Sequence, residues 1–424
     1  MSRKLTTWVL AVSCLVAAYV VVGAALNREQ DPSVPFRQMN VYQEVLEHVR
    51  RDYVTQPNLA KATDGALHGM LASLDPDSSY LNPPEYQAFL QDRRRPHAGS
   101  VGLVVTKRMG YAAIVDVVPG SPAAQARLTR GDFLEAVNHH GTTDLSLVAI
   151  RALLSGTPGA TVPLTAVVLH RIQPEHLSLA IRVLSAPPLS TRMYPGHIGY
   201  IRVPDLRAGR SQQVRHALES LKRQGAQRFV LDLRNCGSGS YREAEHLANL
   251  FLRQGEITTL SGQTVPRQVI SANASDFVTA APLAVLVNAG TFGPAEVTAA
   301  ALLDNHRGPL IGDRTSGEGS VQQLIPLGDG AAVYLSVARY YTPDGQAIQG
   351  HGVKPSIEQV RYAGAMPLAD IPFEGVKPTG PDLQLQKALS VIGGARNTAR
   401  ACPAPAAPLG ARYLDTSFQP AAGL

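Results

Sequence analysis

The residues best suited to chemistry lie in two short segments, each directly after a predicted buried strand. One segment, Asn235–Ser240, follows the run Phe229–Leu233 and carries a thiol and two hydroxyl groups. The other, Ala289–Glu296, follows the run Leu283–Val287 and carries the hydroxyl of Thr291. Hydroxyl and thiol groups become nucleophiles when a neighbouring base takes their proton, and sites in parallel sheets gather where the strands end. Nucleophilic hydrolysis is therefore the first chemistry to consider.

No base stands close in sequence to the nucleophile candidates of the first segment. We therefore expect Cys236, Ser238 and Ser240 to have structural or solvent-exposed roles. The 12 histidines, among them His306 and His351, form no cluster with the spacing of metal ligands. Neither a metal site nor a cofactor is predicted.

The elements around these segments alternate between strand and helix from about residue 197 to residue 360. Strands are predicted at Ile198–Val203, Phe229–Leu233 and Leu283–Val287, and helices at Ser211–Gln224, Arg242–Leu252 and Ala295–Asp304. Such alternation implies parallel strands covered by helices. Residues 186–392 are therefore predicted to form an α/β core built from βαβ units.

Two smaller parts precede this core. Residues 97–185 are predicted to form a β-rich module with two short helices, because apolar strand-like runs alternate with turn residues there. Residues 39–96 are predicted to form a helical segment. Its first helix is amphipathic, because Val41, Val45, Val49 and Tyr53 recur every fourth residue.

The two ends of the chain have compositions of their own. A basic flank at residues 2–4 precedes an uncharged, largely apolar run to residue 26, which predicts a signal peptide or a membrane anchor and hence an exported protein. Residues 27–38 are predicted to be a linker, and residues 393–424, rich in Pro, Ala and Gly, a disordered tail. The net charge of +6 is not gathered into a basic stripe, so no nucleic-acid binding is predicted.

Several motifs in one order resemble the carboxy-terminal processing peptidases, also called tail-specific proteases, of the S41 serine peptidase family. The motifs are Leu74–Leu81, Gly131–Asn138, Asp232–Asn235, Val287–Glu296, Gly312–Gln322 and Val337–Gly345. The resemblance covers most of the chain, from about residue 41 to residue 389. It implies an S41 peptidase-like core with an inserted PDZ-like domain, in a periplasmic, membrane-anchored or secreted protein.

The resemblance also implies a Ser nucleophile, a Lys base and a Gln one helical turn past the Lys that orients it. In this chain the Ser position holds Gly293 and the Lys position holds Glu318, while Gln322 is retained. The oxyanion loop is altered as well, with Ser238 in place of a glycine and Gly239 kept. We therefore predict a pseudoprotease, and the pair Thr291 and Glu318 is the alternative for an active serine-type endopeptidase through a non-standard site. A structural subunit of an envelope assembly is the third possibility.

The PDZ-like module provides a site that does not depend on the missing dyad. In such modules an extended peptide adds to a sheet edge and its C-terminal carboxylate is held by backbone N–H groups. Val101, Gly102 and Leu103 match the family's carboxylate loop. The partners implied are unstructured protein C-termini or an envelope partner protein, with the membrane reached through residues 1–26 if these stay attached, and a homo- or hetero-oligomer is left open.

Overall fold

A computed structural model describes residues 33–94, 99–168, 173–185, 187–361 and 380–394. The predicted signal peptide or anchor at residues 1–26 lies outside these ranges, as does most of the predicted tail at residues 393–424. Of the helices in the described ranges, none combines the length and the hydropathy needed to cross a bilayer.

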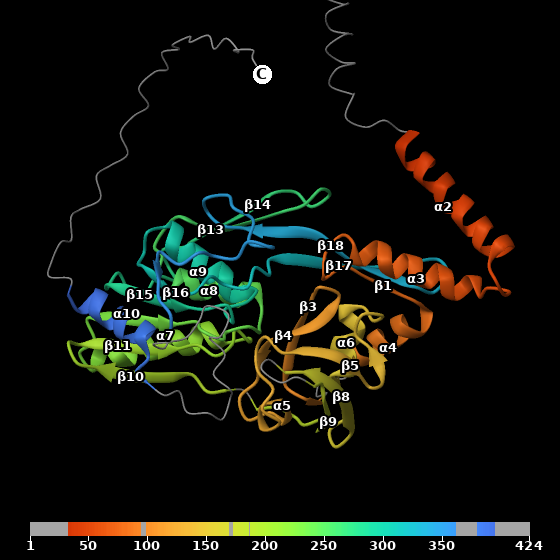
Figure 1. Ribbon diagram of the computed structural model, residues 1–424. Coiled ribbons are helices and arrows are strands. Elements are labelled where there is room, and N and C mark those ends of the chain that lie inside the picture. The colour runs from red at the N-terminus through yellow and green to blue at the C-terminus, as the bar shows by residue number, and fades with distance from the viewer. Residues whose placement is uncertain (1–32, 95–98, 169–172, 186, 362–379, 395–424) are drawn as a thin grey trace, which may run out of the picture.

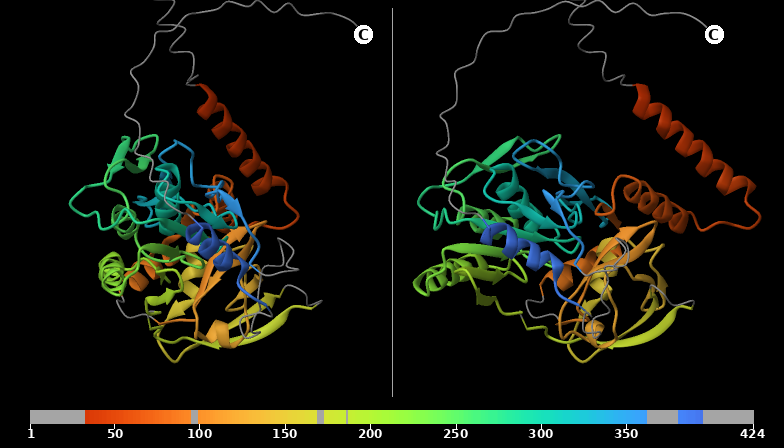
Figure 2. Two further views of the ribbon diagram at one scale, coloured as in Figure 1. Left: turned by 90° about the vertical axis from the view of Figure 1, so that its left-hand side faces the viewer. Right: turned by 60° about the vertical axis from the view of Figure 1, so that its left-hand side comes forward.

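The N-terminal segment is helical, as predicted, but its first helix starts earlier than expected. Helix α2 spans Ser33–Asp52, so the second half of the predicted 27–38 linker is helix. Helix α3 spans Leu59–Ala72 and α4 spans Pro83–Arg93. Figures 1 and 2 show α2 projecting away from the body of the molecule, whereas α3 and α4 lie against it.

The module at residues 99–185 is an antiparallel sheet with two short helices. Its main sheet has the order β3-β4-β5-β8-β9, and a further strand, β6, pairs with β5. The strands are β3 Leu103–Arg108, β4 Tyr111–Val117, β5 Phe133–Val137, β6 His140–Gly141, β8 Thr161–Val167 and β9 Glu175–Ala180. Strands β2 Gly99–Ser100 and β7 Ser155–Gly156 pair separately, and the helices are α5 Pro122–Gln125 and α6 Leu147–Leu153. The strand β3 therefore forms one edge of the main sheet.

The α/β core is confirmed, and its central strands are parallel. The sheet order is β10-β11-β12-β15-β16-β19, and only the edge strand β10 runs antiparallel to its neighbour. The strands are β10 Ser190–Tyr194, β11 Ile198–Arg202, β12 Arg228–Asp232, β15 Leu283–Val287, β16 Leu310–Gly312 and β19 Ile357–Glu358. Because β12 and β15 are parallel neighbours, the two segments singled out in the sequence lie next to each other at the carboxyl ends of these strands.

Helices cover both faces of the parallel sheet. On one face, α7 Arg210–Arg223, α8 Tyr241–Asn249 and α9 Pro294–Asp304 bury apolar side chains against inward-facing residues such as Phe229 and Val285. On the other face, α10 Leu383–Gly393 packs Ala388 and Ile392 against the alternate residues of the same strands. Helix α10 ends at Gly393, the first residue of the predicted tail.

A second antiparallel sheet joins the core to the N-terminal helices. It has the order β1-β18-β13-β14, with β17 also paired to β18. The strands are β1 Ser79–Leu81, β13 Glu256–Ser261, β14 Gln268–Ser271, β17 Ser320–Pro326 and β18 Ala332–Tyr341. Gln322 therefore lies on a strand, so the expected helical-turn spacing between residues 318 and 322 is wrong.

Candidate functional site

Gly293 occupies a sharp turn between a strand and a helix. It follows β15, forms the N-cap of α9, and has a φ of 56° and a ψ of −118°. A strand–turn–helix of this kind holds the nucleophile of many hydrolases above the end of a parallel strand. A Cβ atom at this position would have room, since its nearest neighbours are the Glu318 carbonyl oxygen at 3.9 Å and the Tyr241 Oη at 4.0 Å. The turn thus has the shape of a nucleophile elbow, but the residue at the nucleophile position has no side chain.

The same turn offers no backbone donor to an oxyanion. In hydrolase elbows the N–H of the residue after the nucleophile helps to bind the oxyanion, but that residue here is Pro294, which has no N–H. The N–H groups around it are engaged, because Gly293 donates to Glu296 Oε2 at 2.9 Å and Ala295 donates to the Phe292 carbonyl at 3.3 Å. A second catalytic component is therefore missing from this turn.

Glu296 connects the elbow to the loop that carries Glu318. Its fully buried carboxylate accepts hydrogen bonds from the N–H of Gly293, from the N–H groups of Gly317 at 2.7 Å and Glu318 at 2.8 Å, and from the Thr315 hydroxyl. Burial raises the pKa of Glu296 to about 7, and these hydrogen bonds oppose that rise. The carboxylate fixes the relative position of residues 293 and 318, which are 25 apart in sequence.

The Glu318 side chain points to an acidic neighbour and not to a nucleophile. Its carboxyl group accepts a hydrogen bond from Thr106 Oγ1 of β3 at 3.1 Å and shares another with the carboxyl group of Asp77. Two carboxyl groups can hydrogen-bond only if a proton lies between them. Burial, followed by the charge of Asp77, raises the pKa of Glu318 to about 8, while Thr106 and Arg151 lower it.

Asp77 and Arg151 complete this cluster from two other parts of the chain. The Arg151 guanidinium on α6 lies 3.7 Å from Asp77 Oδ1 and donates to the Val105 carbonyl of β3 at 3.1 Å. Asp77 is nearly buried, with 7% of its side chain exposed, and it precedes β1. The base position thus forms a junction between the core, the N-terminal segment and the β-rich module.

Gln322 is placed near Glu318 but does not bond to it. Its Nε2 donates to Ser320 Oγ at 2.7 Å and to Ser336 Oγ at 3.3 Å. Ser320 in turn donates to Asp77 Oδ2 at 3.1 Å. Gln322 therefore supports the acidic partner of Glu318 through one intervening hydroxyl.

The predicted oxyanion loop faces the elbow and is held by neighbouring backbone. The Ser238 carbonyl accepts the Leu206 N–H at 2.6 Å, and a Cβ on Gly239 would lie 2.1 Å from Leu206 backbone atoms. Gly239 also has a φ of 132°, so only glycine fits there without strain. A Cβ built on Gly237 would lie 3.7 Å from the Asp116 carboxylate, which would oppose an oxyanion forming beside this loop.

The alternative nucleophiles are not in position to act. The Thr291 hydroxyl is fully buried, donates to the Leu233 carbonyl at 2.9 Å and accepts the Asn288 N–H at 3.0 Å. The thiol of Cys236 is fully buried, and burial raises its pKa well above the ordinary value. Ser240 caps α8 by accepting the Glu243 N–H at 3.2 Å. Within the described residues, no three His, Cys, Asp or Glu side chains are grouped to hold a metal ion.

The predicted carboxylate loop is closed in this structure. The Val101 N–H donates to the Leu154 carbonyl at the end of α6 at 3.1 Å, and the Gly102 N–H donates to Ser100 Oγ at 3.0 Å. Leu103 begins β3, the edge strand, whose Val105 carbonyl is covered by Arg151. A peptide that pairs with β3 at Val105 must displace the Arg151 side chain.

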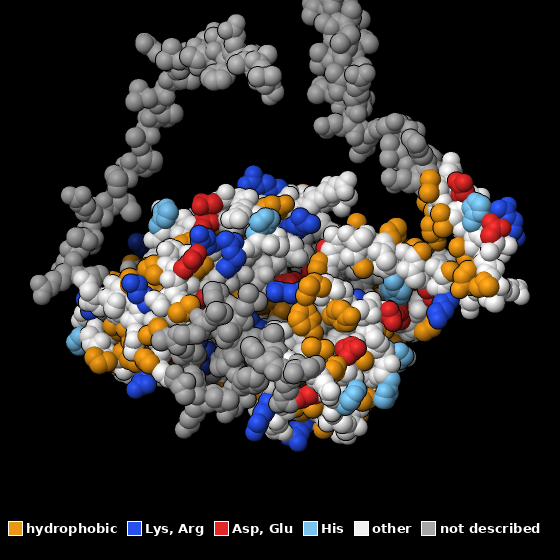
Figure 3. Space-filling view, viewed as in Figure 1, with side chains coloured by type: hydrophobic (Ala, Val, Ile, Leu, Met, Phe, Trp, Pro, Cys, Tyr) orange, Lys and Arg blue, Asp and Glu red, His pale blue; other side chains and the backbone are white. Residues whose placement is uncertain are grey.

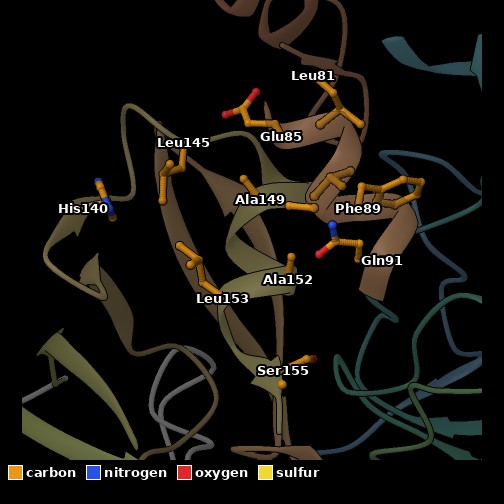
Figure 4. A pocket seen from close by; sticks show the side chains of 13 residues that line it. Leu81, Glu85, Phe89, Gln91, His140, Leu145, Ala149, Ala152, Leu153 and Ser155 are labelled. Atoms are coloured by element: carbon orange, nitrogen blue, oxygen red, sulfur yellow. The ribbon is translucent and has the colours of Figure 1, made fainter. Parts of the chain in front are cut away.

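A separate cavity of about 350 Å³ lies between α4 and α6. Figure 4 shows Phe89 of α4 and Ala149, Ala152 and Leu153 of α6 around it, with Glu85, Gln91 and His140 as polar members of the lining. Neither Gly293 nor Glu318 lines this cavity, so it is distinct from the site of the missing nucleophile.

Sequence reasoning missed Glu296, Asp77, Arg151 and the importance of Pro294. Glu296 was detectable in principle, since it is the single charged residue in the first two turns of an otherwise apolar helix. Pro294 was also detectable, since it directly follows the aligned nucleophile position and a proline has no N–H to offer an oxyanion. Asp77 and Arg151 carry no local signal, because their partners come from distant parts of the chain.

Comparisons with known proteins agree with this geometry. Residues 197–359 match the model of Peptidase family S41. The chain is 30% identical over 366 residues to a carboxy-terminal-processing protease of Bartonella bacilliformis, covering 84% of this chain and 82% of that protein. It is 31% identical over 408 residues to a carboxyl-terminal-processing protease of Synechocystis sp., covering 91% and 93% of the two chains.

A solved structure extends the similarity to three dimensions. The photosystem II D1 C-terminal processing protease superposes with a TM-score of 0.63 at 27% identity, covering 76% of this chain and 92% of that one. These relatives are named for cutting proteins near their C-termini.

Proposed function

The chain belongs to peptidase family S41, and on this premise we propose that it is a catalytically inactive member that binds unstructured protein C-termini without cutting them. The relatives are named as processing proteases, so the class of ligand follows from the family. The proposed loss of peptide cleavage follows from the residues that replace the catalytic groups in this chain.

One observation carries the proposed inactivity. The elbow holds glycine where a nucleophile would attack, followed by a proline that has no N–H for an oxyanion. The facing base position holds Glu318, bonded to Asp77 and Thr106. Nucleophile, base and one oxyanion donor are therefore replaced together, and Thr291 is buried against backbone and cannot substitute.

Cleavage of an unstructured peptide with a free C-terminus tests this directly. The native chain should yield no product by mass spectrometry. A Gly293→Ser, Glu318→Lys double variant should cleave at least about a hundredfold more slowly than a triple variant that also carries Pro294→Ala, because one oxyanion donor is still missing. Only the triple variant that adds Pro294→Ala supplies all three parts, and loss of a single oxyanion donor typically costs a hundredfold to a thousandfold in rate. Cleavage by the native chain would sink the proposal and favour a serine-type endopeptidase with a non-standard site.

The β-rich module is the proposed binding unit, as a PDZ-like domain. Support comes from the edge strand β3, whose outer side can accept an extended peptide, and from the loop at residues 100–103 that leads into it. Arg151 covers this edge through the Val105 carbonyl. Binding would therefore require the Arg151 side chain to be displaced.

A pair of peptides and a pair of variants test the binding mode. By fluorescence anisotropy, a peptide with a free C-terminal carboxylate should bind more tightly than the same peptide with an amidated end. Arg151→Ala should tighten binding up to about tenfold, since a hydrogen bond from a charged donor contributes roughly 1.5 kcal/mol. Arg223→Ala on the exposed side of α7 should leave affinity unchanged. Equal binding of the two peptides would show that the carboxylate is not recognised.

The proposed location is the cell envelope, reached through the apolar segment at residues 5–26. Cell fractionation should recover the chain with the envelope. A protease added on the outer side of the cytoplasmic membrane should then degrade the folded part of the chain. A chain that neither binds nor cuts peptides but co-purifies with one envelope protein would instead be a structural subunit.

A further inference from the structure

Helix α6 contacts both parts of the predicted peptide site. Its buried side packs Ile150 into the core of the β-rich module. Arg151 donates to the Val105 carbonyl of the edge strand β3 at 3.1 Å. At the end of the helix, the Leu154 carbonyl accepts the Val101 N–H of the carboxylate loop at 3.1 Å. A displacement of this one helix would therefore uncover the edge strand and open the carboxylate loop together.

The opposite side of α6 faces the cavity of about 350 Å³. Figure 4 shows Ala149 and Ala152 of α6 on this side, across from Phe89 of α4. An alanine side chain ends at its Cβ atom, so these two positions leave space between the helices, whereas protein interiors are otherwise closely packed. If an extended peptide pushes α6 away from β3, this cavity is the space into which the helix moves.

The walls of the cavity are mainly hydrocarbon. Leu81, Phe89, Val148 and Leu153 line it, and Gln91 adds a group that can form hydrogen bonds. Small-molecule sites in proteins have this volume and this composition, with apolar walls and a few polar groups. The Phe89 ring also offers a surface on which a second aromatic ring can stack. The walls therefore fit a small molecule with an aromatic body and one polar group.

The charges around the cavity favour an uncharged ligand. Among the described residues that line it, none is Lys or Arg, and the single carboxylate, Glu85, already accepts the Asn82 N–H at 3.0 Å and lies 3.4 Å from His68. The Arg93 guanidinium lies 5.6 Å from the centre of the Phe89 ring but does not line the cavity. Figure 3 shows acidic and histidine side chains at the surface around α4. Since burying an unpaired charge costs far more than burying a neutral group, a charged ligand is disfavoured.

We propose that the cavity between α4 and α6 binds a small uncharged molecule with an aromatic body, and that this molecule holds α6 against β3. The second half of the proposal rests on the proposed peptide binding. With the cavity filled, α6 has no space to move into, so Arg151 stays over the Val105 carbonyl and the Val101 N–H stays paired. The small molecule and the peptide share no contact, yet each weakens the binding of the other by the same factor.

Isothermal titration calorimetry with the full chain in phospholipid nanodiscs tests the site, with empty nanodiscs as the reference. Naphthylethanol should bind, and naphthylacetate, which carries a carboxylate on the same ring, should bind at least about tenfold more weakly. Ala88→Phe on α4 and Ala152→Phe on α6 fill the cavity from its two sides, and each should abolish binding. Ala60→Phe on the exposed side of α3 is the matched control and should bind as the native chain does.

Two outcomes of this titration would overturn the proposed site. Binding that persists in both cavity-filling variants would place the naphthyl group in the lipid or elsewhere on the chain. Equal or tighter binding of naphthylacetate, or of naphthylethylamine, would show that the site is not selective for an uncharged ligand. Absence of any naphthylethanol binding by the native chain would overturn the proposal outright.

Hydrogen exchange and peptide binding test the coupling to β3. Naphthylethanol should slow exchange of the Val101 amide, because it stabilises the position of α6 in which this N–H is paired. Saturating naphthylethanol should weaken binding of a peptide with a free C-terminus about fivefold or more, measured by fluorescence anisotropy. Unchanged exchange at Val101 would refute the coupling. A peptide that fails to bind even without naphthylethanol would refute the proposed function alone, because neither the titration nor the exchange measurement involves a peptide.

Discussion

Replacing Glu318 by glutamine should make the protein more stable at neutral and alkaline pH and leave its stability almost unchanged below about pH 5. The Glu318 carboxyl is held between Asp77 and Thr106, where burial and the neighbouring charge raise its pKa to about 8. A glutamine has the same shape, accepts from Thr106 through its oxygen and donates to Asp77 through its nitrogen. It therefore keeps both contacts without requiring a proton.

The magnitude follows from proton linkage. The ordinary pKa of a glutamate is 4.5, so between about pH 5 and pH 8 the folded chain holds a proton that the unfolded chain has released. An acid with a raised pKa in the folded state contributes its full stability below the unfolded pKa and loses it as the pH rises through the folded value. The loss is about 1.4 kcal/mol per pH unit for one proton. From pH 5.5 to pH 7.5 the native chain should lose roughly 2–3 kcal/mol that the Glu318→Gln chain keeps.

Urea unfolding followed by circular dichroism at pH 5.5, 6.5 and 7.5 measures this difference. Glu135→Gln is the control, because Glu135 is exposed on β5 and should follow the native chain at every pH. Parallel stability curves for the native and Glu318→Gln chains would refute the reasoning. They would show that Glu318 titrates as an ordinary glutamate and is not paired with Asp77.

Two further substitutions probe the loops around the elbow. Gly239→Ala should destabilise the fold by roughly 3 kcal/mol or more, because its Cβ would meet the backbone of Leu206 at 2.1 Å, whereas Gly328→Ala has open space and should be neutral in the same urea assay. Glu296→Gln should cost about 1–3 kcal/mol at pH 8, because an amide NH2 would replace an acceptor that faces N–H and O–H donors; unchanged stability would mean that Glu296 does not hold the two loops together.

The sequence was sufficient for the three strands β11, β12 and β15 of the central sheet and for the helices α7, α8 and α9 that follow them. The strands β12 and β15 are short, continuous apolar runs, and such runs alternating with amphipathic helices can pack in few ways. The strands of the second sheet were missed, because most residues on β14 and β17 are exposed or only half-buried and form no continuous apolar run. Strand β17 pairs with β18, and β18 also pairs with β1, which lies more than 250 residues earlier in the sequence.

Only those parts of the candidate site that lie within recognisable sequence motifs could be predicted. Gly293 and Glu318 could be aligned with a known pattern, so the loss of the dyad was evident. The partners of Glu318 were not, because Asp77 and Arg151 reach it from two other parts of the fold. The closure of the loop at Val101 also depends on a distant backbone carbonyl, that of Leu154.

The elbow has a consequence for the evolutionary history of this chain. Glycine at residue 293 removes the strain, about 1–3 kcal/mol, that any other residue would store at a φ of 56°. Proline at residue 294 suits the first position of a helix, because its φ is already fixed near the helical value. Both changes away from the family pattern therefore favour the fold. A single back-mutation at residue 293 would therefore destabilise the chain before it restored any chemistry, so a return to the family's residue at this position carries a stability cost.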